Sequence, residues 1–176
     1  MLEPIHSVNE TAVSYATKTD FCKVFTEEMD SLYLLSLLLT ADNDKAQQCF
    51  VSAMGECVEE TDVFVNWARL SARQAVLKYA IQMIMPVWEH TDRLSFVSCK
   101  GPATWTENNS LAAILALGAF ERFVFVMSIL EGRSEQECSI LLGCSRRDVK
   151  IARVLALKRL ANTDVAYAHA DEILQA

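Results

Sequence analysis

Six basic residues gather near the C-terminus, and within this stretch Asp148 is the only acidic residue. Arginine and lysine at this density bind nucleic-acid phosphates and donate hydrogen bonds to base edges. Arg146, Arg147 and Lys150 are the foremost candidates for DNA contact, and the alternative is a merely solvated basic patch. The predicted DNA-binding residues are Ser145, Arg146, Arg147, Lys150, Arg153, Lys158 and Arg159. Of these, Lys158 and Arg159 suit phosphate contacts or charges at a helix C-terminus.

No other group of residues in the sequence has the types and spacing of a known reactive site. We find no serine or cysteine triad with motif support, no phosphate loop and no dinucleotide fingerprint. The six cysteines form no CxxC pair, and the three histidines are not spaced as zinc ligands near them. We therefore expect no enzymatic activity, no metal and no cofactor. The cysteines should be reduced and should pack as small apolar side chains.

Two predicted helices joined by a glycine position the basic stretch. Ser134 and Glu137 have the spacing of a capping box at the start of the first helix. Gly143 follows this helix at the point where a positive φ costs glycine least. Ser145 opens the second helix, and Asp148 makes a second, weaker box with it. This pattern is typical of a helix-turn-helix, whose second helix enters the major groove; the alternative is an ordinary helical hairpin within a core.

The composition indicates a compact, all-α protein. Of the 176 residues, 52% are hydrophobic and 22% are charged, with only 5 Gly and 3 Pro. The net charge of −7 lies mainly in the first half, because residues 1–100 hold 8 basic and 14 acidic residues, against 8 and 9 in residues 101–176. A DNA-binding surface would therefore be confined to one part of the protein, in the second half of the chain. The longest apolar run is too short to span a membrane, and no signal core begins the chain, so we expect a cytoplasmic protein.

Hydrophobic periodicity predicts several helices in the first half. Asp20 should cap a helix that continues to about residue 41, and a second helix should run from Lys45 to about Met54. An acidic connection follows over residues 56–62, and a long helix then extends from residue 61 or 62 to about 85, where Pro86 stops it. The faces predicted to be buried are Phe21, Val24, Phe25, Met29, Leu32, Leu35 and Leu39, then Val65, Ala68, Ala72, Ala75, Val76, Tyr79 and Met83.

The predicted organisation has two domains joined by a linker, residues 1–86, 87–109 and 110–176. The linker contains Pro102 and the polar run TENN, and its Trp88 and Trp105 suggest that it docks against the protein. The second domain should hold four helices: one from Ser110, one after Gly118 and the two of the helix-turn-helix. Its three phenylalanines should pack in the core. A last short helix is expected in the tail, from residue 162 onward.

The order of these parts resembles the bacterial RNA polymerase sigma factors of the extracytoplasmic-function group. The similarity is best over residues 117–160, which resemble the promoter-binding domain of that family, and it extends more weakly over residues 20–116. The residues in step in the second half are Glu121, Arg122, Phe125, Glu131, Gly132, Ser134, Leu141, Leu142, Gly143, Ser145, Val149, Lys150, Ala156 and Leu160. In the first half they are Asp42, Asp44, Ala46, Phe64, Trp67, Ala72 and Arg73.

The resemblance implies that the first domain binds core RNA polymerase and the opened promoter, and that the second reads promoter DNA as a duplex. An anti-sigma factor would be a further partner. The polymerase-binding candidates are Asp44, Gln47, Gln48, Val51 and Ser52, although family members usually carry acidic residues and glutamine along this helix. The candidates for single-strand contact are Trp67, Arg69, Arg73 and Lys78. The alternatives are a core anchor for Trp67 and a solvated face for the three basic residues.

One apolar stripe of the second helix requires a partner. Ile151, Val154 and Leu155 point largely away from the predicted core face of Val149, Ala152, Ala156 and Leu160. The tail, the first domain or a second protein could cover this stripe, which suggests autoinhibition or dimerisation. Two alternatives to a sigma factor follow: a dimeric helix-turn-helix regulator that does not bind polymerase, and a helical protein-interaction module without a DNA role.

Overall fold

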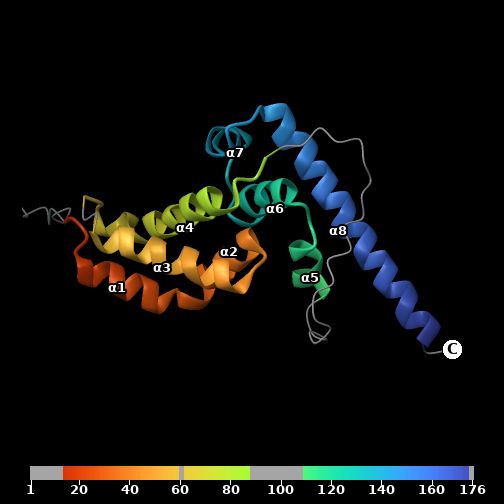
Figure 1. The fold of residues 1–176 in the computed structure, drawn as a ribbon, viewed down its shortest axis with the longest axis horizontal. Coiled ribbons are helices and arrows are strands. Elements are labelled where there is room, and N and C mark those ends of the chain that lie inside the picture. Colours follow the sequence, from red (N-terminus) through yellow and green to blue (C-terminus); the bar gives the residue numbers. More distant parts are fainter. Residues whose placement is uncertain (1–13, 60–61, 88–108, 175–176) are drawn as a thin grey trace, which may run out of the picture.

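The computed structural model describes residues 14–59, 62–87 and 109–174, and the expected all-α class is confirmed for these ranges (Figure 1). A single antiparallel bridge, between Tyr15 and Phe64, is the one β pairing among them. The elements are α1 (Lys18–Glu27), α2 (Met29–Thr40), α3 (Asn43–Glu59), the 3₁₀ turn η1 (Val65–Trp67), α4 (Ala68–Ile84), α5 (Asn109–Leu115), α6 (Ala119–Phe125), the π-helical turn η2 (Val126–Leu130), α7 (Glu135–Leu142) and α8 (Arg146–Leu174).

Helices α1 to α4 pack together as a bundle around side chains spaced three and four residues apart. Most of the predicted core is buried, including Phe21, Leu32 and Leu39, which are completely covered. Two core predictions are wrong: Met29 is 54% exposed and Val65 is 38% exposed. Met29 begins a new helix after a break, so its phase differs from that of α1, and Val65 lies in the 3₁₀ turn before α4.

The predicted helix over residues 20–41 is two helices, and its N-cap is Thr17 rather than Asp20. The Thr17 backbone N–H donates to Asp20 Oδ2 over 2.8 Å, and the Asp20 N–H donates to Thr17 Oγ1 over 3.3 Å. Asp20 is therefore the third helical residue of a capping box. The break falls at Glu28, whose φ of −107° and ψ of 18° leave the helical region.

The boundaries of the next two helices also differ from those predicted. α3 continues through Gly55 to Glu59 instead of ending near Met54. Its buried face of small side chains, Ala46, Cys49, Ala53 and Cys57, packs on α2 and α4, and this burial outweighs the cost of one glycine, about 1 kcal/mol. The predicted start of α4 at residue 61 or 62 is wrong, because the bridge and η1 precede Ala68. Its predicted end is confirmed, since Met85 leaves the helix with φ 48° directly before Pro86.

Helices α5 to α8 form the second half, which contacts the first half chiefly through α5, α6 and η2 against α2. Phe120, Phe123 and Phe125 are buried, as predicted. The buried side chains of both halves form one continuous hydrophobic cluster. The predicted linker, with Trp88 and Trp105, lies almost wholly outside the described residues.

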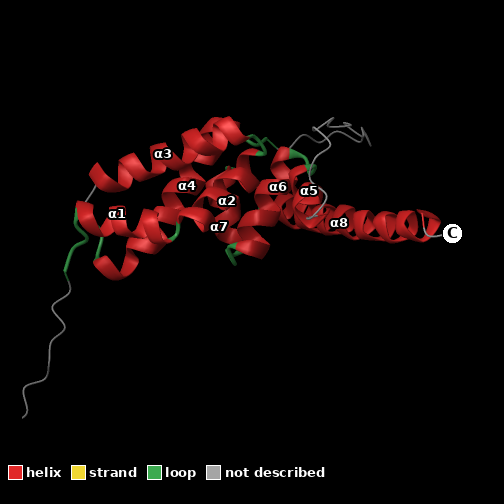
Figure 2. Cartoon of the chain, turned by 90° about the horizontal axis from the view of Figure 1, so that it is seen from below, coloured by secondary structure: helices red, strands yellow, loops and turns green. Residues whose placement is uncertain are grey.

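The predicted separate tail helix is wrong, because the tail continues α8, which runs unbroken from Arg146 to Leu174. At 1.5 Å per residue this helix is about 43 Å long. It projects well beyond the rest of the protein (Figures 1 and 2). The backbone of the tail is therefore part of the same helix as the apolar stripe, and it is not a separate helix packed on that stripe.

No helix in the described ranges is both long enough and apolar enough to cross a membrane.

Candidate nucleic-acid interface

The helical hairpin predicted from the sequence is present, and its first helix begins with the predicted capping box. The Ser134 backbone N–H donates to Glu137 Oε2 over 2.8 Å, and the Glu137 N–H donates to Ser134 Oγ over 3.2 Å. The Ser134 hydroxyl also donates to Glu137 Oε2 over 2.7 Å, and the two bonds that this carboxylate accepts, from the Ser134 hydroxyl and N–H, lower the pKa of Glu137. Two otherwise unpaired backbone donors are thus satisfied, and the start of α7 is well defined.

Gly143 ends α7 with φ 62°, in the left-handed region that favours glycine. The Cys144 N–H donates to the Ser139 carbonyl over 3.0 Å, and the Gly143 N–H donates to the Ile140 carbonyl over 3.3 Å. This pair of bonds is a Schellman motif. It reverses the chain in three residues and sets the angle at which α8 leaves α7.

The second helix of the hairpin begins with the other predicted box. Ser145 Oγ accepts a hydrogen bond from the Asp148 N–H over 3.1 Å, and the Ser145 N–H donates to Asp148 Oδ2 over 3.1 Å. Val149 is fully buried one turn into the helix, and Cys138 is fully buried on α7. Ser139 on α7 is 8% exposed. Its small side chain allows α7 and α8 to approach closely, as predicted. The hairpin core therefore holds α8 firmly against α7.

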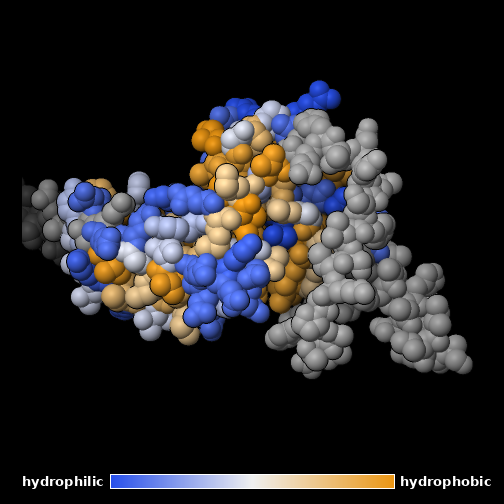
Figure 3. Space-filling model, viewed as in Figure 1, coloured by the Kyte–Doolittle hydropathy of each residue, from blue (hydrophilic) through white to orange (hydrophobic). Residues whose placement is uncertain are grey.

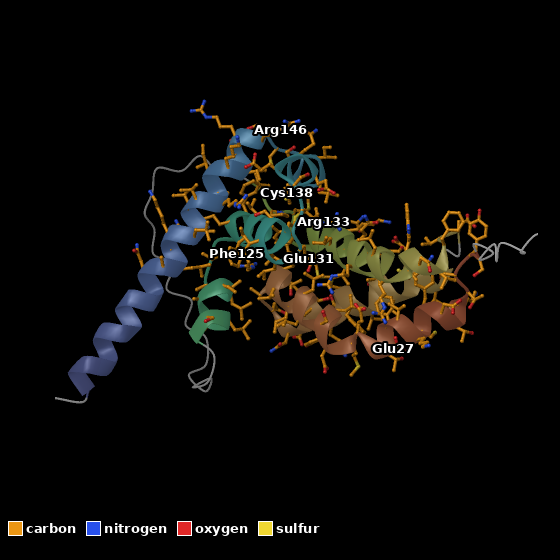
Figure 4. The ribbon with its side chains drawn as sticks, turned by 180° about the vertical axis from the view of Figure 1, so that it is seen from behind. Glu27, Phe125, Glu131, Arg133, Cys138 and Arg146 are labelled. Carbon is orange, nitrogen blue, oxygen red and sulfur yellow. The ribbon has the colours of Figure 1, made fainter. Side chains whose placement is uncertain are left out.

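The start of α8 presents its basic residues to solvent. Arg146, Arg147 and Lys150 are all exposed. Figure 4 shows Arg146 at the tip of the hairpin, where α8 begins. Lys150 Nζ lies 3.5 Å from Glu135 Oε2 on α7, and both side chains remain accessible. The arrangement is that of a helix whose first two turns are open to a polyanion.

The three basic residues farther along α8 have different surroundings. Arg153 is half-buried, and Lys158 is exposed. Arg159 Nη1 donates to Glu121 Oε2 on α6 over 2.7 Å. Burial raises the pKa of the Glu121 carboxyl, and Arg159 partly offsets this rise. Arg159 thus joins α8 to α6. The phosphate contact predicted for this residue stays a prediction.

Trp67 is exposed over 63% of its surface, so it is not the core anchor that one interpretation of the sequence predicts. The Phe64 ring, which precedes η1, stacks on that of Tyr15, with centroids 4.9 Å apart. Both rings remain partly exposed, at 38% and 59%. Exposed aromatic rings of this kind can stack on unpaired bases. Tyr15 could not be identified from the sequence, because it lies in a polar stretch without a periodic pattern.

The basic residues predicted to contact a single strand are all paired with acids. Arg69 binds Glu27 and Glu28, at 3.2 and 3.3 Å. Lys78 Nζ lies 2.7 Å from Glu56 Oε2. Arg73 donates to both carboxylate oxygens of Glu131, which belongs to the second half. In this arrangement a single strand would have to compete with carboxylates for each cation.

A second junction between the halves is built on Arg122, which is only 6% exposed. Its guanidinium donates to the Leu39 carbonyl in the last turn of α2, from Nε at 3.3 Å and Nη2 at 3.2 Å. It also donates to the Leu117 carbonyl, just after α5, over 2.8 Å. A cation at helix C-termini satisfies carbonyls that lack a partner within the helix. Arg122 thus joins α2, α5 and α6.

The outer face of α3 carries the residues predicted to bind polymerase. Asp44, Gln47, Gln48 and Val51 are exposed, and Ser52 is half-buried. Val51 is 59% exposed although it is apolar. This face lies opposite Ala46, Cys49 and Ala53, which are completely buried. It is therefore available to a partner, and it carries little charge beyond Asp44.

The described residues contain no group of three or more His, Cys, Asp or Glu side chains arranged to hold a metal ion. Among the described residues, Cys22, Cys49, Cys57, Cys138 and Cys144 take part in no disulfide bond, and Cys99 lies outside these residues. Burial raises the pKa of both Cys49 and Cys138 to about 11. Thiols of this kind act as small apolar side chains.

No family model matches this chain, and no curated protein or solved structure matches it significantly.

Proposed function

We propose that this chain is a sigma-factor-like transcription initiation protein, which binds core RNA polymerase in the cytoplasm and directs it to promoter DNA through α7 and α8. The observation that carries the proposal is the hairpin geometry. A capped α7, a Schellman turn at Gly143 and a capped α8 leave Arg146, Arg147 and Lys150 exposed on the first two turns of the second helix. This is the form in which helix-turn-helix proteins offer a helix to the major groove.

The charge distribution supports a local DNA-binding surface. The whole chain carries a net charge of −7, so nonspecific binding over its entire surface is unfavourable. Phosphate contacts would come from the exposed edge of α8, and base contacts would come from the side chains that point into the groove. The proposed protein is not an enzyme, because its role is to supply specificity to the polymerase.

Two features of the first half support a role in the opened promoter and on polymerase. Trp67 and the stacked Tyr15–Phe64 pair are exposed where a single strand could stack on them. The α3 face around Gln48 and Val51 is exposed and lies on a rigid, well-packed helix. A polymerase subunit could bind there without rearrangement of the bundle.

Co-elution with purified core RNA polymerase on a sizing column tests the proposal, with an established sigma factor as the positive control. We expect stoichiometric co-elution of the wild type and its loss in V51E. L34E is the matched control, because Leu34 is an apolar residue of α2 with a similar exposed fraction, 45% against 59%. A folded wild-type protein that never co-elutes would refute the polymerase-binding part of the proposal.

A helix-turn-helix regulator that acts without polymerase is the second candidate. It is favoured by the exposed apolar residues on the hairpin, which include Ile140, Leu141, Ile151 and Val154. Figure 3 shows hydrophobic surface over α7. Binding of duplex DNA without co-elution with polymerase would favour this candidate. Absence of salt-dependent DNA binding would instead favour a protein-interaction module.

A further inference from the structure

The outward ridge of α8 has an unusual order of side chains. Arg147, Ile151, Val154 and Lys158 follow one another at spacings of four, three and four residues, so they lie along one line of the helix. This line is opposite the core-facing Val149, Ala152 and Ala156, all fully buried. Ile151 is 39% exposed and Val154 is 50% exposed. Along the helix the ridge therefore presents a cation, two apolar side chains and a second cation.

We propose that Ile151 and Val154 read the methyl groups of thymine in the major groove. This inference rests on the proposed function, in which α8 lies in that groove. Neither side chain can donate or accept a hydrogen bond, so neither can recognise the polar edges of guanine, cytosine or adenine. The thymine C5-methyl is the apolar group that a base pair offers in the major groove, and aliphatic side chains contact it.

The spacing of the two cations on the ridge exceeds the width of the major groove. Arg147 and Lys158 are eleven residues apart, which is about 16 Å along the helix axis. The major groove is about 12 Å wide. The two long cationic side chains can therefore reach phosphates on either side of the groove while the apolar pair between them lies over the base edges. Lys150 reaches toward Glu135 on α7, which leaves the middle of the ridge to Ile151 and Val154.

The same ridge is poorly suited to a second copy of this chain. In a two-fold dimer with antiparallel α8 helices centred between Ile151 and Val154, Arg147 of one copy would face Lys158 of the other. A parallel arrangement would pair each cation with itself. Both arrangements oppose like charges at both ends of a contact whose central line holds two apolar residues, with Leu157 beside it. A polyanion, by contrast, is complementary to both ends.

The test replaces thymine by uracil, which removes the methyl group and nothing else. A preferred duplex is first selected from a random pool with the full-length protein, and each thymine in it is then replaced singly. We expect one or two positions at which uracil weakens binding about fourfold, the effect of one apolar carbon. I151A and V154A should each lose the discrimination between thymine and uracil at the position that the truncated side chain contacts. I140A, which truncates a 67% exposed residue of α7, should keep the discrimination.

The outcomes separate this inference from the proposed function. A selected duplex that binds equally well with thymine or uracil would overturn the inference and leave DNA binding intact. Failure to select any duplex at low salt would overturn DNA binding and the inference together. A concentration-dependent dimer that I151A or V154A abolishes, without any effect on discrimination, would assign the ridge to a second copy. All three truncations lie at exposed helical positions where alanine is favourable, and circular dichroism verifies their folding.

Discussion

Arg73 in α4 and Glu131 after η2 form a two-bond ion pair that joins the two halves of the protein. Arg73 Nε lies 2.8 Å from Glu131 Oε2, and Nη2 lies 2.6 Å from Oε1. The Glu131 side chain is 8% exposed, against 29% for Arg73. These hydrogen bonds raise the pKa of the Arg73 guanidinium. Figure 4 shows Glu131 at this junction, between α4 and the second half. A residue predicted to contact DNA is thus held by the opposite half of the chain.

The first prediction concerns E131Q. Loss of the charged acceptor should lower the free energy of unfolding by about 2 kcal/mol, because a paired, largely buried charge is removed. It should also leave Arg73 with only Ser31 and Glu28 as partners, at 3.0 and 3.8 Å, so single-stranded DNA should bind more tightly and with a salt slope steeper by up to about 0.7. Urea unfolding and fluorescence titration measure the two effects. E59Q is the control, since it removes an exposed acid and changes the net charge equally.

The second prediction concerns the exposed edge of α8. Each of R146A, R147A and K150A should weaken duplex binding and reduce the slope of log affinity against log salt by about 1, because each loses about one phosphate contact. If one of these residues binds guanine through two hydrogen bonds, its loss should cost ~1–3 kcal/mol at a single base pair. K45A, at an exposed site on α3, should leave the slope unchanged. Equal slopes for all four variants would exclude this edge as the DNA contact.

The third prediction compares two glycines. G143A should lower the free energy of unfolding by about 1 to 2 kcal/mol, because alanine is strained at φ 62°. G55A should raise it by about 0.5 to 1 kcal/mol, because Gly55 lies within α3. An added Cβ would meet no atom within 4 Å at either site, so the difference isolates the backbone conformation. Changes of the same sign in thermal or urea unfolding would contradict the geometry described for one of the two glycines.

The hairpin could be predicted from the sequence because its determinants are local. Ser134 with Glu137, Gly143, and Ser145 with Asp148 each act within a few residues, and all five occupy the predicted positions. The core face of α8 also follows from helical periodicity, as the burial of Val149 shows. Local signals of this kind need no knowledge of the rest of the fold.

The junction between the halves could not be predicted, because its partners are far apart in the sequence. Arg73 and Glu131 are separated by 58 positions, and the Arg122 side chain and the Leu39 carbonyl by 83. Neither pairing leaves a periodic or spacing signal. The end of α3 was missed for a related reason, because packing against α2 and α4 carries the helix through Gly55.

The fourth prediction concerns the thiols. Cys22 is exposed, whereas Cys49 and Cys138 are fully buried and their pKa is raised to about 11. A maleimide at pH 7.5 should therefore label Cys22 in the native protein and reach Cys49 and Cys138 only in urea. Mass spectrometry of peptides from the C99S variant gives the pattern. Native labelling of Cys138 at the rate of Cys22 would mean that the hairpin core opens readily.

The last prediction is that Glu137 and Glu121 change stability with pH in opposite directions. The pKa of Glu137 is lowered from its ordinary value of 4.5 by hydrogen bonds from Ser134. The unfolded chain therefore binds the proton more tightly, so the stabilisation by Glu137 is complete above the ordinary pKa and is lost as the pH falls through the folded value. The pKa of Glu121 is raised from 4.5 by burial, so its ionisation lowers the stability as the pH rises through that range.

Urea unfolding of the wild type, E137Q and E121Q between pH 3 and 7 tests both signs. Subtraction of each variant from the wild type cancels the titration of all other groups that the substitution leaves unchanged. The difference for E137Q should grow as the pH rises from 3 to 6, because the carboxylate that caps α7 becomes charged. The difference for E121Q should fall over the same range, because a buried carboxylate loses solvation that Arg159 only partly replaces. Differences that change in the same direction would show that one of the two carboxyl environments is wrongly described.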